Sequence, residues 1–351
     1  MTKFHGITDY MHKVYYHIVF GLVDCSSLDY SLKVRLATLN VSRNGTRPAF
    51  MSFPIQRVVI VGGTHGNELT GIYLVKKFRR HLHLLTRKSF DTLTLLANTK
   101  AIAANRRFIS RDLNRCFAAH DLANPFLDSY EEQRAKEIAT QLTPEFSSNV
   151  DVIVDVHSTT SNMGFTIIPS TRNPLILRLA AYLRSLNPLV RVCLGIQGNQ
   201  DASVLRSLSP LGFTLEVGPV PQGVLNAYYL QQTEQLIHGI LDYLDALNHG
   251  NLLPTHPNLL MYQTVSYVDY PRDLSGELDA AIHPRLESMD FKPLTHGEPM
   301  FLKFTGESVP YLEGETVCPV FINEAAYYEK NIAMILTHEQ LLNFESESHS
   351  R

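Results

Sequence analysis

The segment Arg57-Val-Val-Ile-Val-Gly-Gly-Thr-His-Gly-Asn-Glu68 decides the fold of this 351-residue chain. Its β-branched run is typical of a strand that is buried on both faces, as in a parallel sheet covered by helices. A second run of this kind, Val150–Val156, leads directly into His157. Ligands of an open parallel sheet bind beyond the carboxyl ends of its strands, so we expect the polar residues at these two strand ends to share one site.

Strand-like and helix-like patterns alternate from residue 57 to about residue 248. Such alternation is typical of an α/β fold, in which helices cover both faces of a mostly parallel or mixed sheet. Strands are predicted over 58–61, 92–97, 150–156, 191–196 and 212–217, and helices through 74–78 and over 130–142, 175–186 and 225–247.

The sequence changes character after Asn248. Eight prolines follow between Pro254 and Pro319, with alternating apolar and polar residues between them. Short strands bounded by proline and glycine are typical of a small β-rich unit. We therefore predict three parts: an α/β domain over 51–250, a β-rich C-terminal domain over 251–351, and an N-terminal appendage or wrongly assigned start over 1–50.

Charge and cysteine content exclude several classes of protein. Thirty-one basic and 34 acidic side chains give a net charge of −3, which argues against a strongly basic nucleic-acid binder. The four cysteines form no closely spaced pair, as is usual in a reducing cytosol. No apolar run reaches the roughly 18 residues of a membrane span. We expect a cytoplasmic protein that binds neither nucleic acid nor membranes.

His65 and Glu68 are three residues apart at a strand end, so both side chains can converge where the chain turns into a helix. Together with His157 they form a His₂Glu set, which in catalytic zinc sites leaves a fourth position open for water. Other interpretations remain. The pair can arise by chance among 15 histidines, and His157 can be a core histidine bonded to backbone. A phosphate loop is disfavoured because no GK[ST] follows the glycines.

Two further features of the sequence suggest residues with a chemical role. Three arginines within nine residues, Arg107 to Arg115 with Asn114 between them, suit the bidentate capture of a carboxylate. They also fit a solvated surface loop. Glu216 lies in an apolar strand, where an ionised carboxylate is costly unless it is paired or functional. A raised pKa would suit a general base, and the alternative is a structural partner for an arginine.

Six motifs in series resemble the aspartoacylase family of zinc carboxypeptidase-like amidohydrolases. The resemblance runs in order from about residue 57 to 330 and leaves residues 1–50 uncovered. The motifs are Gly62-Gly-Thr-His-Gly-Asn-Glu-Leu-Thr-Gly, Arg111-Asp-Leu-Asn-Arg, Asp155-Val-His-Ser-Thr-Thr-Ser-Asn-Met-Gly, Leu215-Glu-Val-Gly-Pro-Val-Pro-Gln-Gly-Val-Leu, Val268-Asp-Tyr-Pro-Arg and Pro319-Val-Phe-Ile-Asn-Glu-Ala-Ala-Tyr-Tyr-Glu-Lys.

The resemblance implies a role for each matching residue. His65, Glu68 and His157 would bind one Zn²⁺ per subunit. Glu216 would activate the water held by zinc and then protonate the leaving amine, while Arg107 would stabilise the oxyanion. The α-carboxylate of the substrate would be held by Asn114, Arg115 and Tyr327, and its side-chain carboxylate by Arg206. Asp112 and Asp155 are candidates for orienting an arginine or a histidine that binds the metal.

The resemblance implies an amidohydrolase (EC 3.5.1.15) that cleaves N-acyl-L-aspartate, most simply N-acetyl-L-aspartate, to a carboxylate and L-aspartate. Family members have a tyrosine four residues before the specificity arginine, but this chain has Ala202. The first alternative function is therefore that of an aminoacylase-3-like deacylase, which acts on other N-acyl amino acids. A zinc-binding interaction module without catalysis and a peptidase are the others. The partner is a small N-acyl amino acid, and the resemblance is compatible with a homodimer.

Overall fold

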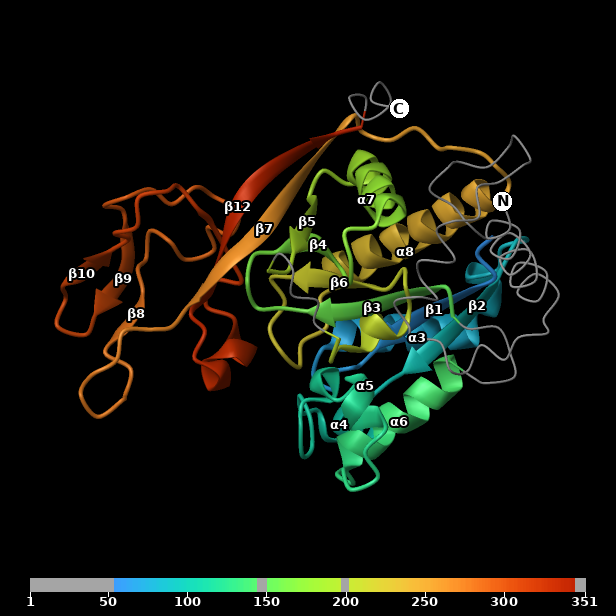
Figure 1. Ribbon diagram of the computed structural model, residues 1–351, viewed down its shortest axis with the longest axis horizontal. Coiled ribbons are helices and arrows are strands. Elements are labelled where there is room, and N and C mark those ends of the chain that lie inside the picture. Colours follow the sequence, from blue (N-terminus) through green and yellow to red (C-terminus); the bar gives the residue numbers. More distant parts are fainter. Residues whose placement is uncertain (1–53, 144–149, 197–201, 345–351) are drawn as a thin grey trace, which may run out of the picture. The chain divides into compact units, whose positions relative to one another are not determined.

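Figure 1 shows the computed structural model, which describes residues 54–143, 150–196 and 202–344. The predicted appendage over 1–50 lies outside these residues. The described strands are β1 (Arg57–Gly62), β2 (Asp91–Leu96), β3 (Val152–Ser158), β4 (Gly164–Pro169), β5 (Val190–Leu194), β6 (Phe213–Gly218), β7 (Asn258–Val268), β8 (Ala280–Ile282), β9 (Pro299–Lys303), β10 (Ser308–Pro310), β11 (Cys318–Val320) and β12 (Met334–Asn343).

Helices and short 3₁₀ turns connect these strands. They are α3 (Leu69–Arg80), η2 (Leu82–Leu84), α4 (Thr99–Ala104), η3 (Leu113–Arg115), α5 (Ala119–Leu122), α6 (Tyr130–Leu142), α7 (Pro174–Leu186), η4 (Leu205–Leu208), α8 (Ala227–Asn248) and η5 (Ala325–Lys330). None of the described helices has the length and apolar character that a membrane span requires.

One nine-stranded mixed sheet organises the described part of the chain. Its strand order is β11-β12-β7-β5-β4-β6-β3-β1-β2. Strands β2, β1, β3 and β6 are parallel to one another, whereas β4 runs antiparallel to β6 and parallel to β5, and β5 is parallel to β7. The sheet thus continues past residue 250 through β7, β12 and β11, while β8, β9 and β10 form a separate small sheet.

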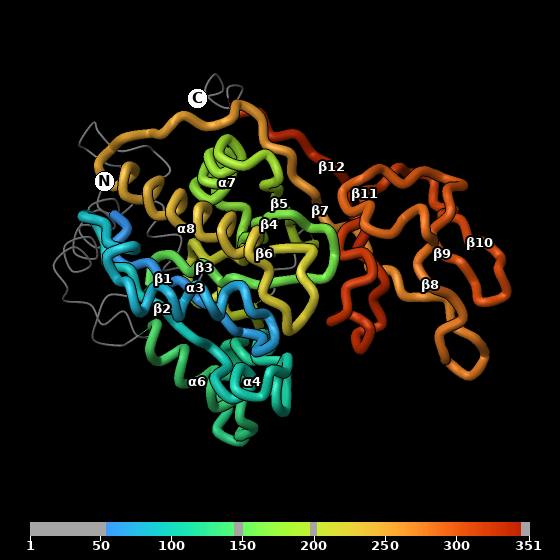
Figure 2. The backbone as a smooth tube through the Cα atoms, turned by 180° about the vertical axis from the view of Figure 1, so that it is seen from behind, coloured from blue at the N-terminus to red at the C-terminus, as the bar shows by residue number. Residues whose placement is uncertain are grey.

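Helices cover both faces of the sheet, as the sequence predicts. Helix α3 packs on β1, β3 and α8, and Figure 2 shows α7 and α8 together on one side with α4 and α6 on the other. Alternate residues of β1 face opposite ways, so Val59 and Val61 join a core cluster with Ala135 and Ile138 of α6. Buried on both faces, β1 and β3 form the rigid centre from which the polar loops project.

Most of the predicted elements are confirmed within one or two residues. The predicted helix over 130–142 coincides with α6, where Ser129 and Glu132 form a capping box. The first strand, the helix through 74–78 and the long helix over 225–247 correspond to β1, α3 and α8. Strand β4 and the short helices α4 and α5 were not predicted, because none of these three segments shows a long periodic pattern.

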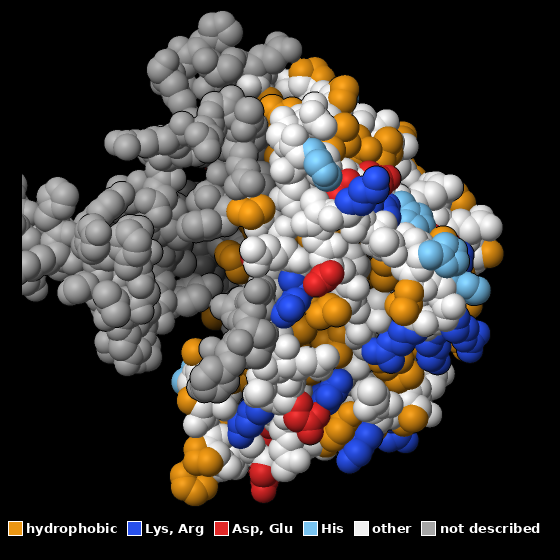
Figure 3. All heavy atoms as spheres, turned by 90° about the vertical axis from the view of Figure 1, so that its right-hand side faces the viewer, with side chains coloured by type: hydrophobic (Ala, Val, Ile, Leu, Met, Phe, Trp, Pro, Cys, Tyr) orange, Lys and Arg blue, Asp and Glu red, His pale blue; other side chains and the backbone are white. Residues whose placement is uncertain are grey.

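Several basic side chains lie on the face of the molecule that Figure 3 shows, together with acidic ones and histidines. The segment from the last turn of α3 to the residues just after η2 carries a run of basic side chains and histidines: Lys77, Arg79, Arg80, His81, His83 and Lys88. Lys77 pairs with Glu234 at 2.6 Å, and nearby Arg87 pairs with Asp242 at 2.7 Å. Because α8 supplies acidic partners here, we interpret this run as a solvated surface rather than a nucleic-acid site.

Gly71 allows α3 to lie directly against β3. An added Cβ would lie 2.7 Å from the carbonyl oxygen of Val156, a backbone atom that cannot rotate away. Gly239 in α8 offers a contrast, because its nearest neighbour is the terminal Cδ1 of Leu186 at 2.8 Å. The close packing of α3 therefore fixes where the loop between β1 and α3 meets the end of β3.

We expect Gly71→Ala to lower the free energy of unfolding by about 1–3 kcal/mol, the usual range for overpacking, although alanine favours a helix interior. Gly239→Ala is the matched control and should be close to neutral, because a leucine side chain can move. Urea unfolding of the two variants tests this expectation. Equal stability of Gly71→Ala and the parent chain would contradict it.

Candidate active site

The loop that follows β1 carries the first two polar residues of the site. Gly66 is required in this loop because an added Cβ would lie 2.1 Å from the carbonyl carbon of Ala101 in α4. The amide of Gly66 donates to the carbonyl of Arg107 at 3.1 Å. This close approach brings the segment that carries Arg107 beside the loop that carries His65 and Glu68.

The structure brings His65, Glu68 and His157 together, with ligand atoms within 4.8 Å of one another. Nδ1 of His65 lies 2.6 Å from Oε1 of Glu68, and Nδ1 of His157 lies 3.0 Å from Oε2 of the same carboxylate. The two Nδ1 atoms face each other at 3.1 Å. All three side chains are buried, so this group of two imidazoles and one carboxylate could hold a metal ion.

Two further carboxylates fix how the imidazoles face. Nε2 of His65 lies 3.0 Å from Oδ1 of Asp112, and Nε2 of His157 lies 2.8 Å from Oδ2 of Asp155. A carboxylate accepts the Nε2 proton, so it selects the tautomer whose Nδ1 carries a lone pair. Both lone pairs then point at Glu68. A positive charge is favoured between the rings and Glu68: burial lowers the pKa of His157, but Asp155 and Glu68 outweigh it and raise that pKa well above its usual value. A metal ion held by these three side chains would supply the same positive charge.

Glu68 occupies the N-cap position of α3, but its side chain makes no capping hydrogen bond to the helix. Its two oxygens instead accept from Nη1 of Arg107 at 3.1 Å and from the amide of Ser158 at 3.0 Å, besides facing the two histidines. Burial raises the pKa of Glu68, but the neighbouring histidines outweigh burial and hold the pKa well below its usual value. The carboxylate is therefore ionised, which is the form that binds a metal.

Glu216 lies beside His157 because β6 pairs with β3 in parallel register, with these two residues directly opposite. Burial raises the pKa of Glu216 to about 8, and the charges of Glu68 and Glu324 act in the same direction. His157 and Arg107 oppose that shift. A carboxyl group whose pKa is raised in this way could exchange a proton near neutral pH.

The predicted carboxylate-binding residues come from two 3₁₀ turns that are bonded to each other. Oδ1 of Asn114 in η3 accepts from the amide of Leu205 in η4 at 2.9 Å, which leaves the amide nitrogen of Asn114 as a donor. Arg206 follows in η4, and its Nη1 donates to Thr214 of β6 at 3.2 Å. Arg115 lies beside Asn114. The two turns therefore hold Asn114, Arg115 and Arg206 on one side of the cavity.

Tyr327 reaches the site from the C-terminal part of the chain, where the turn η5 is fastened at both ends. Glu324 accepts from the amide of Thr160 at 2.7 Å, from both threonine hydroxyls of the loop after β3, and from the amide of Ala326 at 3.0 Å. At the other end, Nζ of Lys330 lies 3.3 Å from Asp112. Burial raises the pKa of Tyr327, so its phenol is a neutral donor.

Glu324 and Lys330 were not predicted as site residues. Both lie inside the motif that starts at Pro319, so the resemblance covers them, but only the fold shows what they contact. Asp112 and Asp155 were predicted only as candidates, and the structure places each of them against a histidine. The nine residues predicted for catalysis, substrate binding and metal binding all line one cavity.

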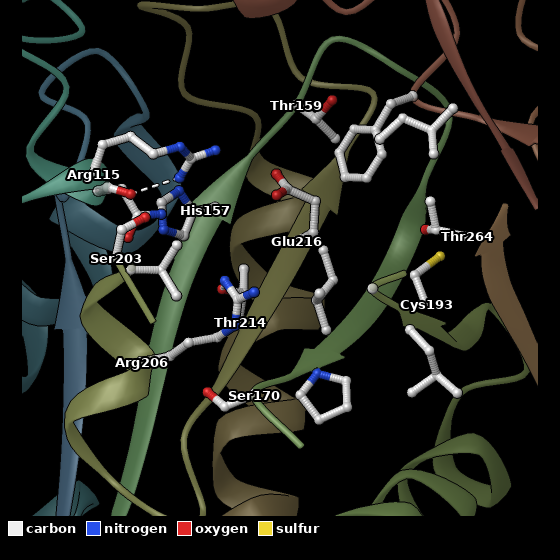
Figure 4. A pocket seen from close by; sticks show the side chains of 18 of the residues that line it. Arg115, His157, Thr159, Ser170, Cys193, Ser203, Arg206, Thr214, Glu216 and Thr264 are labelled. Carbon is white, nitrogen blue, oxygen red and sulfur yellow. Dashed lines mark hydrogen bonds between the residues drawn. The ribbon is translucent and has the colours of Figure 1, made fainter. Parts of the chain in front are cut away.

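That cavity has a volume of about 900 Å³. Figure 4 shows Glu216 near its middle, with Arg115, His157, Ser203 and Arg206 toward one side and Cys193 and Thr264 toward the other. The site thus combines a possible metal group, a protonatable carboxylate and several cations in one cavity. This arrangement can polarise a carbonyl, move a proton and hold an anionic ligand.

Two family models match the described part of the chain. The model for the succinylglutamate desuccinylase/aspartoacylase catalytic domain matches residues 54–244, and the model for the AstE/AspA barrel-sandwich hybrid domain matches residues 257–339. The two models together cover most of the chain. The sheet described above is continuous across both matched regions.

Individual relatives match along nearly their full length. The chain is 51% identical to a "Probable aspartoacylase" of Nostoc sp. over 82% of this chain and 98% of the relative. It is 40% identical to an N-acyl-aromatic-L-amino acid amidohydrolase of Rattus norvegicus over 80% of this chain and 90% of that protein. The crystal structure of murine aminoacylase 3 superposes with a TM-score of 0.78 at 38% identity, covering 83% and 97% of the two chains.

Proposed function

Because the chain belongs to the succinylglutamate desuccinylase/aspartoacylase family, its activity is that of a hydrolase of amide bonds, and we propose that it cleaves N-acyl-L-aspartate. The simplest such substrate is N-acetyl-L-aspartate, which gives acetate and L-aspartate. One observation carries this proposal: Glu216, a buried carboxyl with a raised pKa, is paired in register with His157 of the His65, Glu68 and His157 group, and Arg115 and Arg206 lie on the same side of the cavity as His157.

We propose that His65, Glu68 and His157 hold one zinc ion. The donor set of two imidazoles and one carboxylate is typical of catalytic zinc, and the histidines are oriented by carboxylates as zinc ligands usually are. When bound, zinc acts as a Lewis acid that polarises a carbonyl and lowers the pKa of water into the neutral range. The remaining chemistry belongs to the side chains around it.

Glu216 moves the proton. As a carboxylate it takes the proton of the attacking water, and as a carboxylic acid it gives that proton to the nitrogen of the leaving aspartate. Both steps are efficient when the pKa of the group lies near the working pH, and burial places the pKa of Glu216 at about 8. A cation bound nearby favours the ionised form and lowers this pKa toward neutrality.

Arg107 stabilises the negative charge that develops on the amide oxygen. Its guanidinium is anchored by Glu68 at 3.1 Å and by Asp112 at 3.5 Å, so it is held in position before the substrate binds. A donor fixed in advance does not have to reorganise during the reaction, which makes it effective in a dry cavity. The α-carboxylate is bound by Asn114, Arg115 and the neutral phenol of Tyr327.

Arg206 selects an acidic side chain in this proposal. It lies on the same side of the cavity as Arg115, so the two arginines suit the two carboxylates of an aspartyl group. Ala202, which also lines the cavity, favours a second candidate because it lacks the tyrosine hydroxyl of other aspartoacylases. That candidate is a deacylase of other N-acyl amino acids, the activity named for the relative from Rattus norvegicus.

Glu216→Gln tests the chemistry. We expect the zinc-loaded variant to lose N-acetyl-L-aspartate hydrolysis by about 10²–10⁴-fold in kcat, because glutamine cannot carry the proton. The exposed Glu137→Gln in α6 is the matched control and should leave kcat unchanged. Released aspartate and bound zinc are measured on the same samples. Full turnover by Glu216→Gln, or turnover of the parent chain that survives a chelator, would contradict this mechanism.

Arg206→Gln tests the substrate. We expect kcat/KM for N-acetyl-L-aspartate to fall about 10–100-fold, the cost of losing a hydrogen bond between charged groups, with a much smaller change for N-acetyl-L-leucine. Arg172→Gln is the control, since Arg172 is an exposed arginine at the rim of the same cavity. If kcat/KM of the Arg206 variant falls equally for both substrates, Arg206 does not select the acidic side chain.

A further inference from the structure

The cavity is much larger than the simplest substrate requires. Its volume of about 900 Å³ is in the range of pockets that enclose drug-sized ligands, whereas N-acetyl-L-aspartate has only about a dozen non-hydrogen atoms. The arginines and the metal-binding group occupy one side of it. The rest of the cavity lies on the other side of Glu216, toward Cys193 and Thr264 (Figure 4).

The floor of this second part is formed by the sheet itself. Ile168 of β4 is paired with Thr214 of β6, and Cys193 of β5 follows one register position after the pairing of Ile167 with Val192. Thr214, Ile168 and Cys193 therefore form a row across three adjacent strands. Since strands lie about 4.8 Å apart, the row extends about 10 Å from β6 to β5.

The walls come from the C-terminal part of the chain. Val320, Phe321 and Ile335 line the cavity and belong to one hydrophobic cluster with Cys193, against which Ile168 packs. We call the region lined by Ile168, Cys193, Val320, Phe321 and Ile335 the apolar lobe. These five side chains offer no partner to a carboxylate, and Gln263 and Thr264 of β7, which line the cavity between β5 and β12, carry no charge. The lobe therefore suits an apolar group better than the dianionic aspartyl part of the substrate.

The backbone at Phe321 supports a functional role for this wall. Phe321 has a φ of 52°, in the left-handed region that bulky residues rarely adopt. The conformation is held from both sides, because the amide of Phe321 donates to Sδ of Met163 at 3.3 Å and the next amide, of Ile322, donates to Asp290 at 3.0 Å. Strained residues that persist in this way cluster at ligand sites.

We propose that the apolar lobe binds the acyl chain of the substrate, and that the preferred substrates are N-acyl-L-aspartates with saturated chains of about six to eight carbons. Such a chain matches the distance of about 10 Å from β6 to β5. This inference rests on the proposed function, because Arg115 and Arg206 must hold both carboxylates on the opposite side of Glu216 for the acyl group to face the lobe.

The reaction is the same hydrolysis and needs no further reactant. The amide C–N bond breaks and the oxygen of one water molecule joins the acyl carbon. One proton of the water passes to the aspartate nitrogen, and the other follows it when the new carboxylic acid ionises, which leaves a carboxylate and an ammonium group. The products are a medium-chain carboxylate and L-aspartate. Only the length of the acyl group differs from the acetyl case.

A series of N-acetyl-, N-butanoyl-, N-hexanoyl- and N-octanoyl-L-aspartate tests the inference on the zinc-loaded full chain. Full burial of a methylene corresponds to about fourfold in affinity, so we expect kcat/KM to rise at least tenfold from acetyl to octanoyl. A steady fall of kcat/KM with chain length overturns the inference and leaves the proposed function standing. If none of the four compounds is hydrolysed, the proposed function is overturned, and this inference with it.

The variant Ile168→Phe tests whether the acyl chain of the substrate binds in the apolar lobe. The larger ring occupies the floor, so we expect the octanoyl-to-acetyl ratio of kcat/KM to fall at least tenfold. Leu82→Phe, at an exposed site in η2, is the matched control and should keep the parent ratio. An unchanged octanoyl-to-acetyl ratio in Ile168→Phe overturns the inference. If that variant does not fold, the substrate series measured on the parent protein decides whether the inference holds.

N-acetyl-L-phenylalanine tests whether the apolar lobe binds an aromatic amino-acid side chain instead of the acyl chain. If this compound is hydrolysed faster than N-acetyl-L-aspartate and Ile168→Phe abolishes its turnover, the lobe holds an aromatic amino-acid side chain and the inference is wrong. If its turnover is slow and insensitive to Ile168→Phe, the acyl chain remains the occupant that the structure favours.

Discussion

The orientation of two imidazole rings is the constraint on which the site depends. Asp112 and Asp155 lie against Nε2 of His65 and His157, at 3.0 and 2.8 Å, and so direct both Nδ1 atoms toward Glu68. Three elements must stay in place for this to hold: the loop after β1, the end of β3 and the segment before η3. Gly71 lets α3 pack against β3, and the amide of Gly66 donates to the carbonyl of Arg107 in the segment before η3, so fold stability and site geometry are coupled.

The same contacts connect the C-terminal part of the chain to the metal-binding group. Asp112 also faces Lys330, and Glu324 is bonded to the loop that follows His157, so η5 is attached on both sides of the group that it covers. Tyr327 lies between these two attachments. The C-terminal strands β7, β12 and β11 also extend the main sheet, and Val320 of β11 and Ile335 of β12 line the cavity. The cavity is thus lined by residues that lie far apart in sequence.

The sequence was informative where chemistry and local pattern coincide. His65, Glu68 and His157 could be predicted because they lie at the ends of two β-branched runs, and α6 because its capping box and period are local. The antiparallel insertion of β4 and the pairing of β7 with β5 could not be predicted, since periodicity says nothing about partner strands. Glu324 and Lys330 were missed for the same reason, because their partners lie in other elements.

A crystal structure of the zinc-loaded protein, with anomalous diffraction measured at the zinc edge, tests the account most directly. We expect one strong peak bound by Nδ1 of His65, Nδ1 of His157 and the carboxylate of Glu68, with Asp112 and Asp155 still against the two Nε2 atoms. A peak bound through Nε2 of either histidine, or no peak at this group in protein that hydrolyses N-acyl-aspartate, would contradict the account.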